Sequence, residues 1–176
     1  MITAEEFKSA FRLHPSGVAL ISANVSGTQV ALTASSVSAV SAEPPLLMFS
    51  ISVLSSSAEV LKRADAVIVH LLTAGNLELA TLGAASGVDR FADETRWSRL
   101  PTGEPVFAEA GVWLRVRIVH RIDAGGSTVF VAEGVDASVS DRSVEDDGLV
   151  YRNRAWHRVG SESVVDGAHL VSSAAS

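Results

Sequence analysis

A run of neutral hydroxyl groups is the part of this sequence best suited to bind a ligand. Residues 33–57 include nine serines and a single charged side chain, that of Glu43. Ser55, Ser56 and Ser57 directly precede a segment with helical spacing, and hydroxyls beside backbone N–H groups at a helix start can hold a phosphate. The alternative is that Ser57 only caps the helix while the other serines lie in turns or on a solvated strand face. The spacing alone leaves both interpretations open.

Most other catalytic chemistries lack their residues in this sequence. Because the chain has no cysteine, it has no disulfide, thiolate nucleophile, iron–sulfur cluster or Cys-based zinc site. The five histidines are never spaced as a metal-binding pair on a helix, so no metal site is expected. His120 falls on the apolar phase of a strand and is expected in the core. The glycine motifs of serine hydrolases, Rossmann folds and P-loops are also missing, so a bound nucleotide would need other contacts.

A second group of interest is Asp89-Arg90-Phe91. We interpret it as a loop ion pair with an aromatic anchor, and the alternative is a contact to a bound ring. The three tryptophans are expected in the core or at an interface.

Short strands joined by tight turns must position these residues. The chain has 24 valines against one tyrosine and two methionines, which favours β-structure. Alternation and turn signals predict strands at 18–25, 29–34, 37–41, 46–53, 65–72, 112–122, 128–139, 149–151 and 155–159. Helices are predicted from the capping-box residue Thr3 to about Leu13, at 58–64 and at 76–85, with irregular structure over 89–110. The pattern is typical of a mainly β fold with short helices, an antiparallel barrel or sandwich.

Length and charge limit the organisation and the partners. The 176 residues, 47% of them hydrophobic, predict one domain over residues 1–160 followed by a tail over 161–176. A net charge of −6 argues against binding to nucleic acids or to membrane surfaces. The acidic start does not resemble an export signal, and no apolar run reaches the roughly 20 residues of a membrane helix. We therefore expect a cytoplasmic protein.

An ordered series of motifs resembles one known family. The motifs are Pro15-Ser16-Gly17-Val18, the stretch from Ala31 to Ser41, Pro44-Pro45-Leu46, Ser55-Ser56-Ser57, Asp89-Arg90-Phe91, Gly125-Gly126 and Leu149-Val150-Tyr151. In this order, over about residues 7–160, they resemble the short-chain flavin reductases. These are the NAD(P)H-dependent reductase components of two-component flavin monooxygenases.

The resemblance implies a split β-barrel of the Greek-key-like antiparallel kind, forming a homodimer that binds FMN or FAD near the subunit boundary. NADH or NADPH would pass a hydride to the flavin N5 without a side-chain acid or base, and reduced flavin would diffuse to a partner monooxygenase. The implied flavin contacts are Thr33, Ala34, Ser35 and Ser36 along the flavin, Val40 and Ser41 beside the isoalloxazine, Ser50 and Ile51 through their backbone, Ser55, Ser56 and Ser57 at the phosphate, and Arg90 and Phe91 closing over it.

One motif departs from the family pattern. Many members have Gly-Asp-His after the long strand, with the histidine near the nicotinamide, whereas this chain has Gly125-Gly126-Ser127. By position, Ser127 and Tyr151 would lie on the nicotinamide side. Two alternatives to a reductase stay open: a flavin carrier of the same fold without catalysis, and a pyridoxamine-phosphate-oxidase-like enzyme. The latter favours a basic phosphate site, which residues 33–57 lack.

Overall fold

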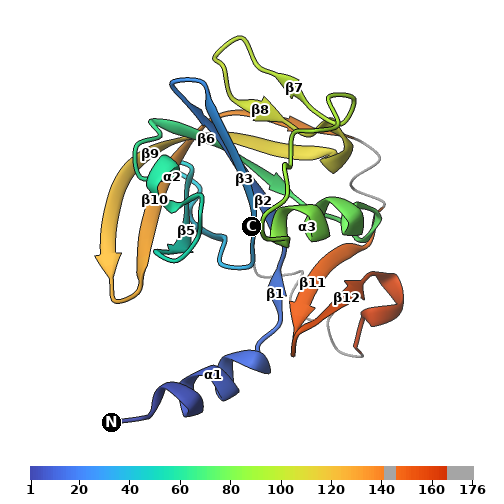
Figure 1. Cartoon of the computed structure of the whole chain (residues 1–176). Helices are drawn as coiled ribbons and strands as arrows, with labels where there is room; N and C mark the ends of the chain where they lie inside the picture. The colour runs from blue at the N-terminus through green and yellow to red at the C-terminus, as the bar shows by residue number, and fades with distance from the viewer. Residues whose placement is uncertain (141–145, 166–176) are drawn as a thin grey trace.

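Twelve strands and three short α-helices make up the part of the chain that the computed structural model describes, residues 1–140 and 146–165 (Figure 1). The strands are β1 (Ser16–Gly17), β2 (Ala19–Val25), β3 (Thr28–Ala34), β4 (Ser38–Ser41), β5 (Leu46–Ser52), β6 (Ala66–Leu71), β7 (Ser98–Arg99), β8 (Pro105–Val106), β9 (Val112–Ala124), β10 (Ser127–Val139), β11 (Gly148–Arg152) and β12 (Ala155–Val159). The helices are α1 (Ala4–Arg12), α2 (Ala58–Leu61) and α3 (Leu77–Ala84), and 3₁₀ turns are η1 (Ala74–Asn76), η2 (Ala108–Ala110) and η3 (Ser161–Ser163). The main predicted elements are confirmed, and the segment 89–110 is irregular apart from the short β7–β8 pair and η2.

One antiparallel sheet dominates the molecule. Its strands follow the order β3-β2-β6-β9-β10-β5-β4, and every neighbouring pair is antiparallel. The sheet curls far enough for β3 to contact β5, although the two strands are not paired (Figure 1). Strands β1, β11 and β12 form a smaller sheet beside it. The prediction of a mainly antiparallel β fold is therefore confirmed.

Strand β2 is buried on both faces and separates two apolar clusters. On one face Ile21 packs inside the curled sheet in the same cluster as Phe49 and Phe130, whose rings stack with their centroids 4.9 Å apart. On the other face Leu20 belongs to a cluster that includes Leu79 of α3. Helix α3 is thus held against the outside of the sheet, which fixes the position of its C-terminal end.

Helix α1 begins with the predicted capping box. The Thr3 hydroxyl accepts a hydrogen bond from the Glu6 N–H, and the Glu6 carboxylate accepts one from the Thr3 N–H. The Thr3 N–H and the Thr3 hydroxyl both donate to this carboxylate, which lowers the pKa of Glu6. None of the α1 residues is buried, and Figure 1 shows the helix projecting from the sheet. Its C-terminal end is tied to the β11–β12 turn because the Asn153 N–H donates to the Arg12 carbonyl at 2.7 Å.

The prediction for His120 is wrong. Val116 and Ile118 are buried as the alternation of β9 predicts, but His120 is exposed. The register of β9 against β10 shifts between the pairs Ile118–Ala132 and His120–Val131, which leaves Val119 as a bulge. A bulge reverses the alternation beyond it, and a sequence pattern with period two cannot show where that happens.

The predicted C-terminal tail is only partly described. Turn η3 covers Ser161–Ser163, whereas residues 166–176 of the predicted tail lie outside the described residues, so the boundary at residue 160 stays a prediction. In the described residues, no helix combines the length and apolar character needed to cross a membrane. The same part of the chain contains no cluster of histidine and acidic side chains that could hold a metal ion.

Candidate functional site

A cavity of about 690 Å³ opens where β3, β5 and the end of α3 meet, and we call it the serine pocket. Most of the residues assigned to the flavin or nicotinamide line it: Thr33, Ala34, Ser35, Ser36, Ser50, Ile51, Ser55, Ser56, Arg90 and Ser127. Its volume lies in the range of roughly 300–1,000 Å³ that is typical of cofactor pockets. The fold therefore gathers side chains from five separate segments around one space of suitable size.

The remaining assigned residues lie outside this pocket. Val40 is exposed on the edge strand β4, and Ser41 lines a separate apolar pocket. Ser57 is buried, with 2% of its surface exposed. Phe91 packs in an aromatic cluster, and Tyr151 lines a neighbouring pocket described below.

The wall formed by β3 is fixed from outside the sheet. The Thr33 hydroxyl donates a hydrogen bond to the Ala80 carbonyl of α3 at 2.6 Å. This hydroxyl is therefore already engaged in joining α3 to β3. Beyond Ala34, where β3 ends, the backbone of residues 35–37 belongs to neither strand ladder, which leaves its polar groups available to a ligand.

The floor is fixed by a reciprocal contact between two serines. The Ser36 hydroxyl accepts a hydrogen bond from the Ser50 N–H and donates one to the Ser50 carbonyl, both at 3.0 Å. Because the backbone N–H and carbonyl of Ser50 both engage the Ser36 hydroxyl, this hydroxyl shapes the pocket and is not a free donor. The neighbouring Ser35 side chain is exposed, and within the described residues its hydroxyl makes no hydrogen bond.

The serines before α2 divide into two kinds. Ser55 and Ser56 line the pocket, and the Ser55 hydroxyl accepts a hydrogen bond from the Ser57 N–H at 3.3 Å. Ser57 occupies the N-cap position of α2, but its side chain makes no capping hydrogen bond. The alternative in which the Ser57 side chain caps this helix is therefore not supported, and the local hydroxyl contact comes from Ser55 instead.

Arg90 brings a positive charge to the pocket that residues 33–57 lack. Its Nη2 donates to the Ala85 carbonyl at 2.5 Å, and its Nε is buried without a hydrogen-bond partner in the described structure. The expected ion pair with Asp89 does not form, because the Asp89 carboxylate accepts the Phe91 N–H at 2.9 Å. A buried, unpaired guanidinium nitrogen at a pocket wall is a ready donor for an anionic ligand.

The aromatic-anchor part of that interpretation is confirmed. The Phe91 ring packs edge-on against Trp97, with ring centroids 5.3 Å apart, and lies 5.7 Å from the ring of Phe107. The Trp97 indole N–H also donates to the Phe91 carbonyl at 3.1 Å. These contacts hold the residue next to Arg90 against the core.

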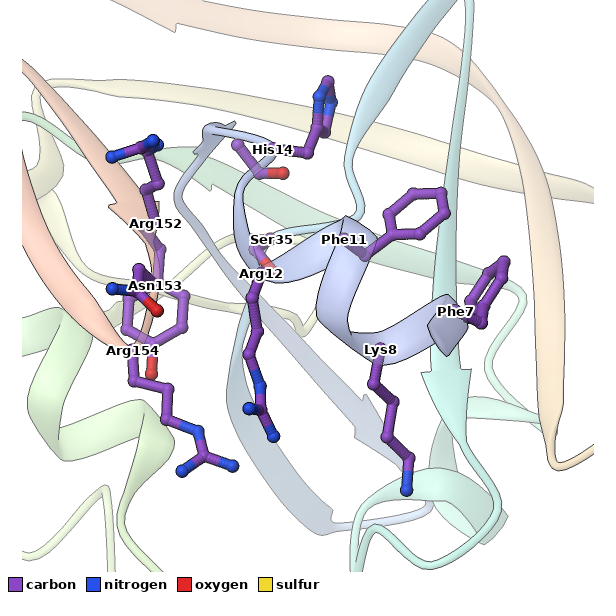
Figure 2. A pocket seen from close by; sticks show the side chains of 11 residues that line it. Phe7, Lys8, Phe11, Arg12, His14, Ser35, Arg152, Asn153 and Arg154 are labelled. Carbon is purple, nitrogen blue, oxygen red and sulfur yellow. The ribbon is translucent and has the colours of Figure 1, made fainter. Parts of the chain in front are cut away.

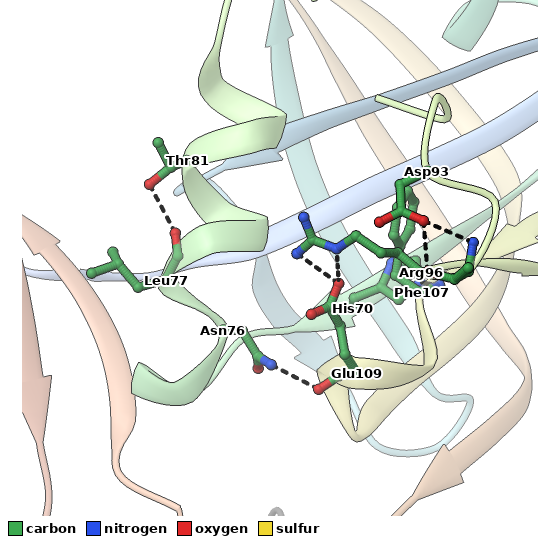
Figure 3. A network of polar contacts seen from close by, with 9 residues as sticks. His70, Asn76, Leu77, Thr81, Asp93, Arg96, Phe107 and Glu109 are labelled. Carbon is green, nitrogen blue, oxygen red and sulfur yellow. Dashed lines mark hydrogen bonds and ion pairs between the residues drawn. The ribbon is translucent and has the colours of Figure 1, made fainter. Parts of the chain in front are cut away.

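A polar network holds the rest of this loop (Figure 3). Arg96 pairs with the Glu109 carboxylate at 2.9 Å, and the Asn76 side chain donates to the Glu109 carbonyl at 2.7 Å. The Asp93 carboxylate accepts hydrogen bonds from the hydroxyl and N–H of Thr95, which lower the pKa of Asp93. The segment that carries Arg90 is thus tied to η1 and η2.

Seven residues that line the serine pocket were not predicted from the sequence. They are Leu32, Ser52, Leu54, Gly83, Ala84, Ser86 and Gly87. A signal for four of them was present, because small residues fill the chain from Gly83 to Gly87, directly before Asp89-Arg90-Phe91. A run of small residues after a helix lets a backbone approach a ligand closely.

Comparisons with known proteins identify the family of this chain. Residues 11–160 match the model of the flavin reductase like domain. An NADH:FMN oxidoreductase of Rhodococcus qingshengii is 37% identical over 158 residues, which cover 86% of this chain and 82% of the relative. The crystal structure of a flavin reductase domain protein from Arthrobacter sp. FB24 is 31% identical, with a TM-score of 0.84 over 90% of this chain and 96% of that one. That of the flavin reductase HpaC complexed with NADP⁺ is 26% identical, with a TM-score of 0.80 over 90% and 99% of the two chains.

The curled antiparallel sheet and these structural neighbours define a split-barrel fold. Within that fold, the chain belongs to the flavin reductase-like domain family. The resemblance noted from the sequence motifs and the split-barrel prediction are both confirmed.

Proposed function

We propose that this chain is an NAD(P)H-dependent flavin reductase whose serine pocket holds FMN or FAD. The observation that carries the proposal is the serine pocket itself, which gathers hydroxyls of β3, β5 and the α2 loop around the unpaired Nε of Arg90. A flavin needs a flat, largely neutral wall for its ring system and a local donor set for its phosphate. Leu32, Ala34 and Ile51 offer apolar lining to the ring, and Ser55, Ser56 and Arg90 offer donors to the phosphate.

The residues that line the serine pocket fall into two chemical groups. Ser55, Ser56 and Arg90 would hold the phosphate, since hydroxyls and a guanidinium both donate to an anion. The wall from Thr33 to Ser36, with Ile51, would lie along the isoalloxazine. Val40, Ser41, Ser57 and Phe91 stay outside this part of the proposal, because none of them lines the pocket.

The residues of the protein would orient the flavin and the nicotinamide and exclude water from them. The bound flavin would supply the redox chemistry by accepting a hydride at N5 from a dihydronicotinamide. The backbone N–H groups of residues 35–37 could donate to the pyrimidine side of the ring, where negative charge develops. The Thr33–Ala80 and Ser36–Ser50 contacts would hold that wall in place. Because the hydride passes directly to the flavin, this proposal needs no side-chain acid or base.

Oxidation of NADH and of NADPH at 340 nm, with FMN, FAD or riboflavin added, tests the activity. A reductase consumes the nicotinamide in proportion to the flavin reduced. A protein that binds flavin tightly without oxidising either nicotinamide would be a carrier, and one that instead oxidises pyridoxamine phosphate would be the other alternative; both results contradict the proposal.

The assembly and the partner are part of the proposal. An apolar pocket formed by β4, β5, β6 and β9 includes Leu46, Leu71 and Leu114, and Val40 and Met48 are exposed on the same strands. This surface supports a homodimer, and light scattering should give twice the chain mass of 18.4 kDa. The consumer of reduced flavin would be a monooxygenase reached by diffusion, and the cytoplasmic location stays a prediction.

A further inference from the structure

Helix α1 has an apolar face that stays exposed in the described part of the chain. Phe7 and Phe11 lie one turn apart on this face, with their ring centroids 4.6 Å apart, and the two residues are 51% and 59% exposed. No residue of the helix is buried. Because a short helix in water depends on packing of its apolar face, this face is suited to contact another surface.

The position of α1 is fixed at its C-terminal end. The Asn153 N–H donates a hydrogen bond to the Arg12 carbonyl at 2.7 Å. A cavity of about 390 Å³, which Tyr151 also lines, separates the helix from the β11–β12 turn (Figure 2). Phe7 and Phe11 border this cavity, and Figure 2 shows their rings on the side away from Asn153. The helix is thus held with its phenylalanine rings directed outward.

The same chain also has an apolar groove whose described lining contains no charged side chain. Two cavities, of about 330 and 260 Å³, share Val37 and Leu71 and together form this apolar groove. Its lining also includes Leu46, Leu114 and Val159. Leu71 and Val159 are 41% and 47% exposed, although both side chains are apolar. No residue of α1 is part of the lining, so the helix of the same copy does not fill the groove.

We propose that the apolar face of α1 docks into the apolar groove of a second copy of this chain, while the helix of that copy docks into the groove of the first. Both surfaces lie on one chain, so a two-fold pair covers each of them in both copies. The uncharged groove suits phenylalanine rings, whereas a charged partner would leave its charges unpaired there. The inference rests on the homodimer of the proposed function and names the contact that forms it.

Substitutions on each side of the contact test it in the full chain. The double change Phe7→Ser and Phe11→Ser removes the rings, and Leu71→Ser changes the groove. Light scattering over about 1–100 μM should give the wild type twice the chain mass of 18.4 kDa. Both variants should associate about tenfold or more weakly, because buried aromatic and apolar anchors dominate such contacts. Leu77→Ser is the matched control, since Leu77 is 42% exposed on α3 and lines neither cavity.

Three results of this measurement would overturn the inference. They are a wild type that is monomeric over the whole range, association of both variants within twofold of the wild type, and equal dissociation of Leu77→Ser. Circular dichroism shows whether each variant is folded, and we expect it to be, because all four substituted side chains are exposed.

Cross-linking reports the contact even if a substitution in the groove disturbs the fold. The chain has no cysteine, so an introduced cysteine is the only thiol in each copy. Co-expressed Phe11→Cys and Leu71→Cys chains, with tags of different mass, should give a mixed cross-linked product with a short bismaleimide. Phe11→Cys with Leu77→Cys should not. No mixed Phe11–Leu71 product, or an equal yield from the control pair, would contradict the docking.

These measurements need neither flavin nor nicotinamide, so they separate this inference from the proposed function. A wild type that oxidised no nicotinamide would contradict the reductase activity, and the Phe11–Leu71 product would still support the docking. A dimeric wild type without that product, whose mass the substitutions leave unchanged, would keep the homodimer and exclude α1 as its contact.

Discussion

Gly83 lies directly against Thr33 at the wall of the serine pocket. A Cβ atom on Gly83 would come within 2.4 Å of the Thr33 hydroxyl oxygen and 2.9 Å of the Thr33 backbone nitrogen. Because α3 packs on β3 at this distance, the hydroxyl of Thr33 can reach the Ala80 carbonyl. The absence of a side chain at position 83 is thus part of the pocket's construction.

Gly83→Ala should therefore weaken both the fold and flavin binding. The methyl group meets backbone as well as side chain, and overpacking of this kind costs about 1–3 kcal/mol. Urea unfolding should show the loss, and fluorescence titration should show weaker FMN binding because the pocket wall moves. Gly126→Ala is the control, since a Cβ there would meet nothing within 4 Å. Equal stability of the two variants would contradict the close contact.

Arg90→Gln should reduce the affinity for FMN far more than that for riboflavin. One charge-assisted donor to a phosphate contributes about 1.5–3 kcal/mol, which corresponds to roughly 10–100-fold in Kd. The double change Ser55→Ala and Ser56→Ala should act in the same direction. Ser57→Ala is the control, because Ser57 is buried outside the pocket. If riboflavin lost as much affinity as FMN, Arg90 would be structural and the phosphate would lie elsewhere.

His70 should make the protein less stable as the pH falls below neutrality. It is fully buried, its Nδ1 lies 3.0 Å from the Leu20 carbonyl, and its Nε2 accepts the Phe107 N–H at 3.0 Å, so the ring is held neutral (Figure 3). Burial lowers the pKa of His70 from 6.5 to about 4. The unfolded chain takes up a proton near pH 6.5, whereas the folded chain does so only near pH 4.

The free energy of unfolding should thus be fully present above pH 6.5 and fall by about 3 kcal/mol by pH 4 from this group alone. His70→Gln, whose amide can donate to the Leu20 carbonyl and accept the Phe107 N–H, should flatten that part of the pH dependence. His120→Gln changes an exposed histidine and should leave it as in the wild type. The measurement is urea unfolding between pH 4 and 7, and an unchanged slope in His70→Gln would rule out this role.

Local patterns revealed the strands and half of the site. Strand alternation and turn signals depend on neighbouring residues, so the strands could be predicted locally. The Thr33–Ser36 and Ser55–Ser56 segments line the serine pocket, as the order of the motifs implied. The motif order also implied Arg90, which lines the same pocket because Phe91 packs on Trp97 and Phe107, a long-range contact that strand alternation and turn signals do not report.

Side-chain direction is what the local patterns do not show. The family resemblance places Ser57 at the phosphate with Ser55 and Ser56, but Ser57 is buried outside the serine pocket, so this contact stays a prediction. Alternation along β9 predicts a buried His120, and this is wrong because the bulge at Val119 reverses the alternation.

Ser127, which the family resemblance places at the position of a histidine in many members, lines the serine pocket. It is the first residue of β10, is half-buried, and is paired in register with Ser52 of β5. If this edge of the pocket faces the nicotinamide, an imidazole here gains about one hydrogen bond to the carboxamide. Ser127→His should then lower the KM for NADH by about two- to tenfold, the equivalent of roughly 0.5–1.5 kcal/mol.

The KM for the flavin should stay unchanged in that variant, because the proposed function places the flavin ring along the wall from Thr33 to Ser36. Ser127→Ala tests whether the existing hydroxyl contributes, and it keeps the hairpin turn at Gly125-Gly126 intact. Steady-state kinetics with NADH and flavin varied separately resolve the two sites. If Ser127→His and Ser127→Ala both stay within twofold of the wild type for NADH, Ser127 is only a turn residue and the nicotinamide binds away from this edge. A change confined to the flavin KM would place Ser127 against the flavin instead, because binding of NADH would then not depend on this side chain.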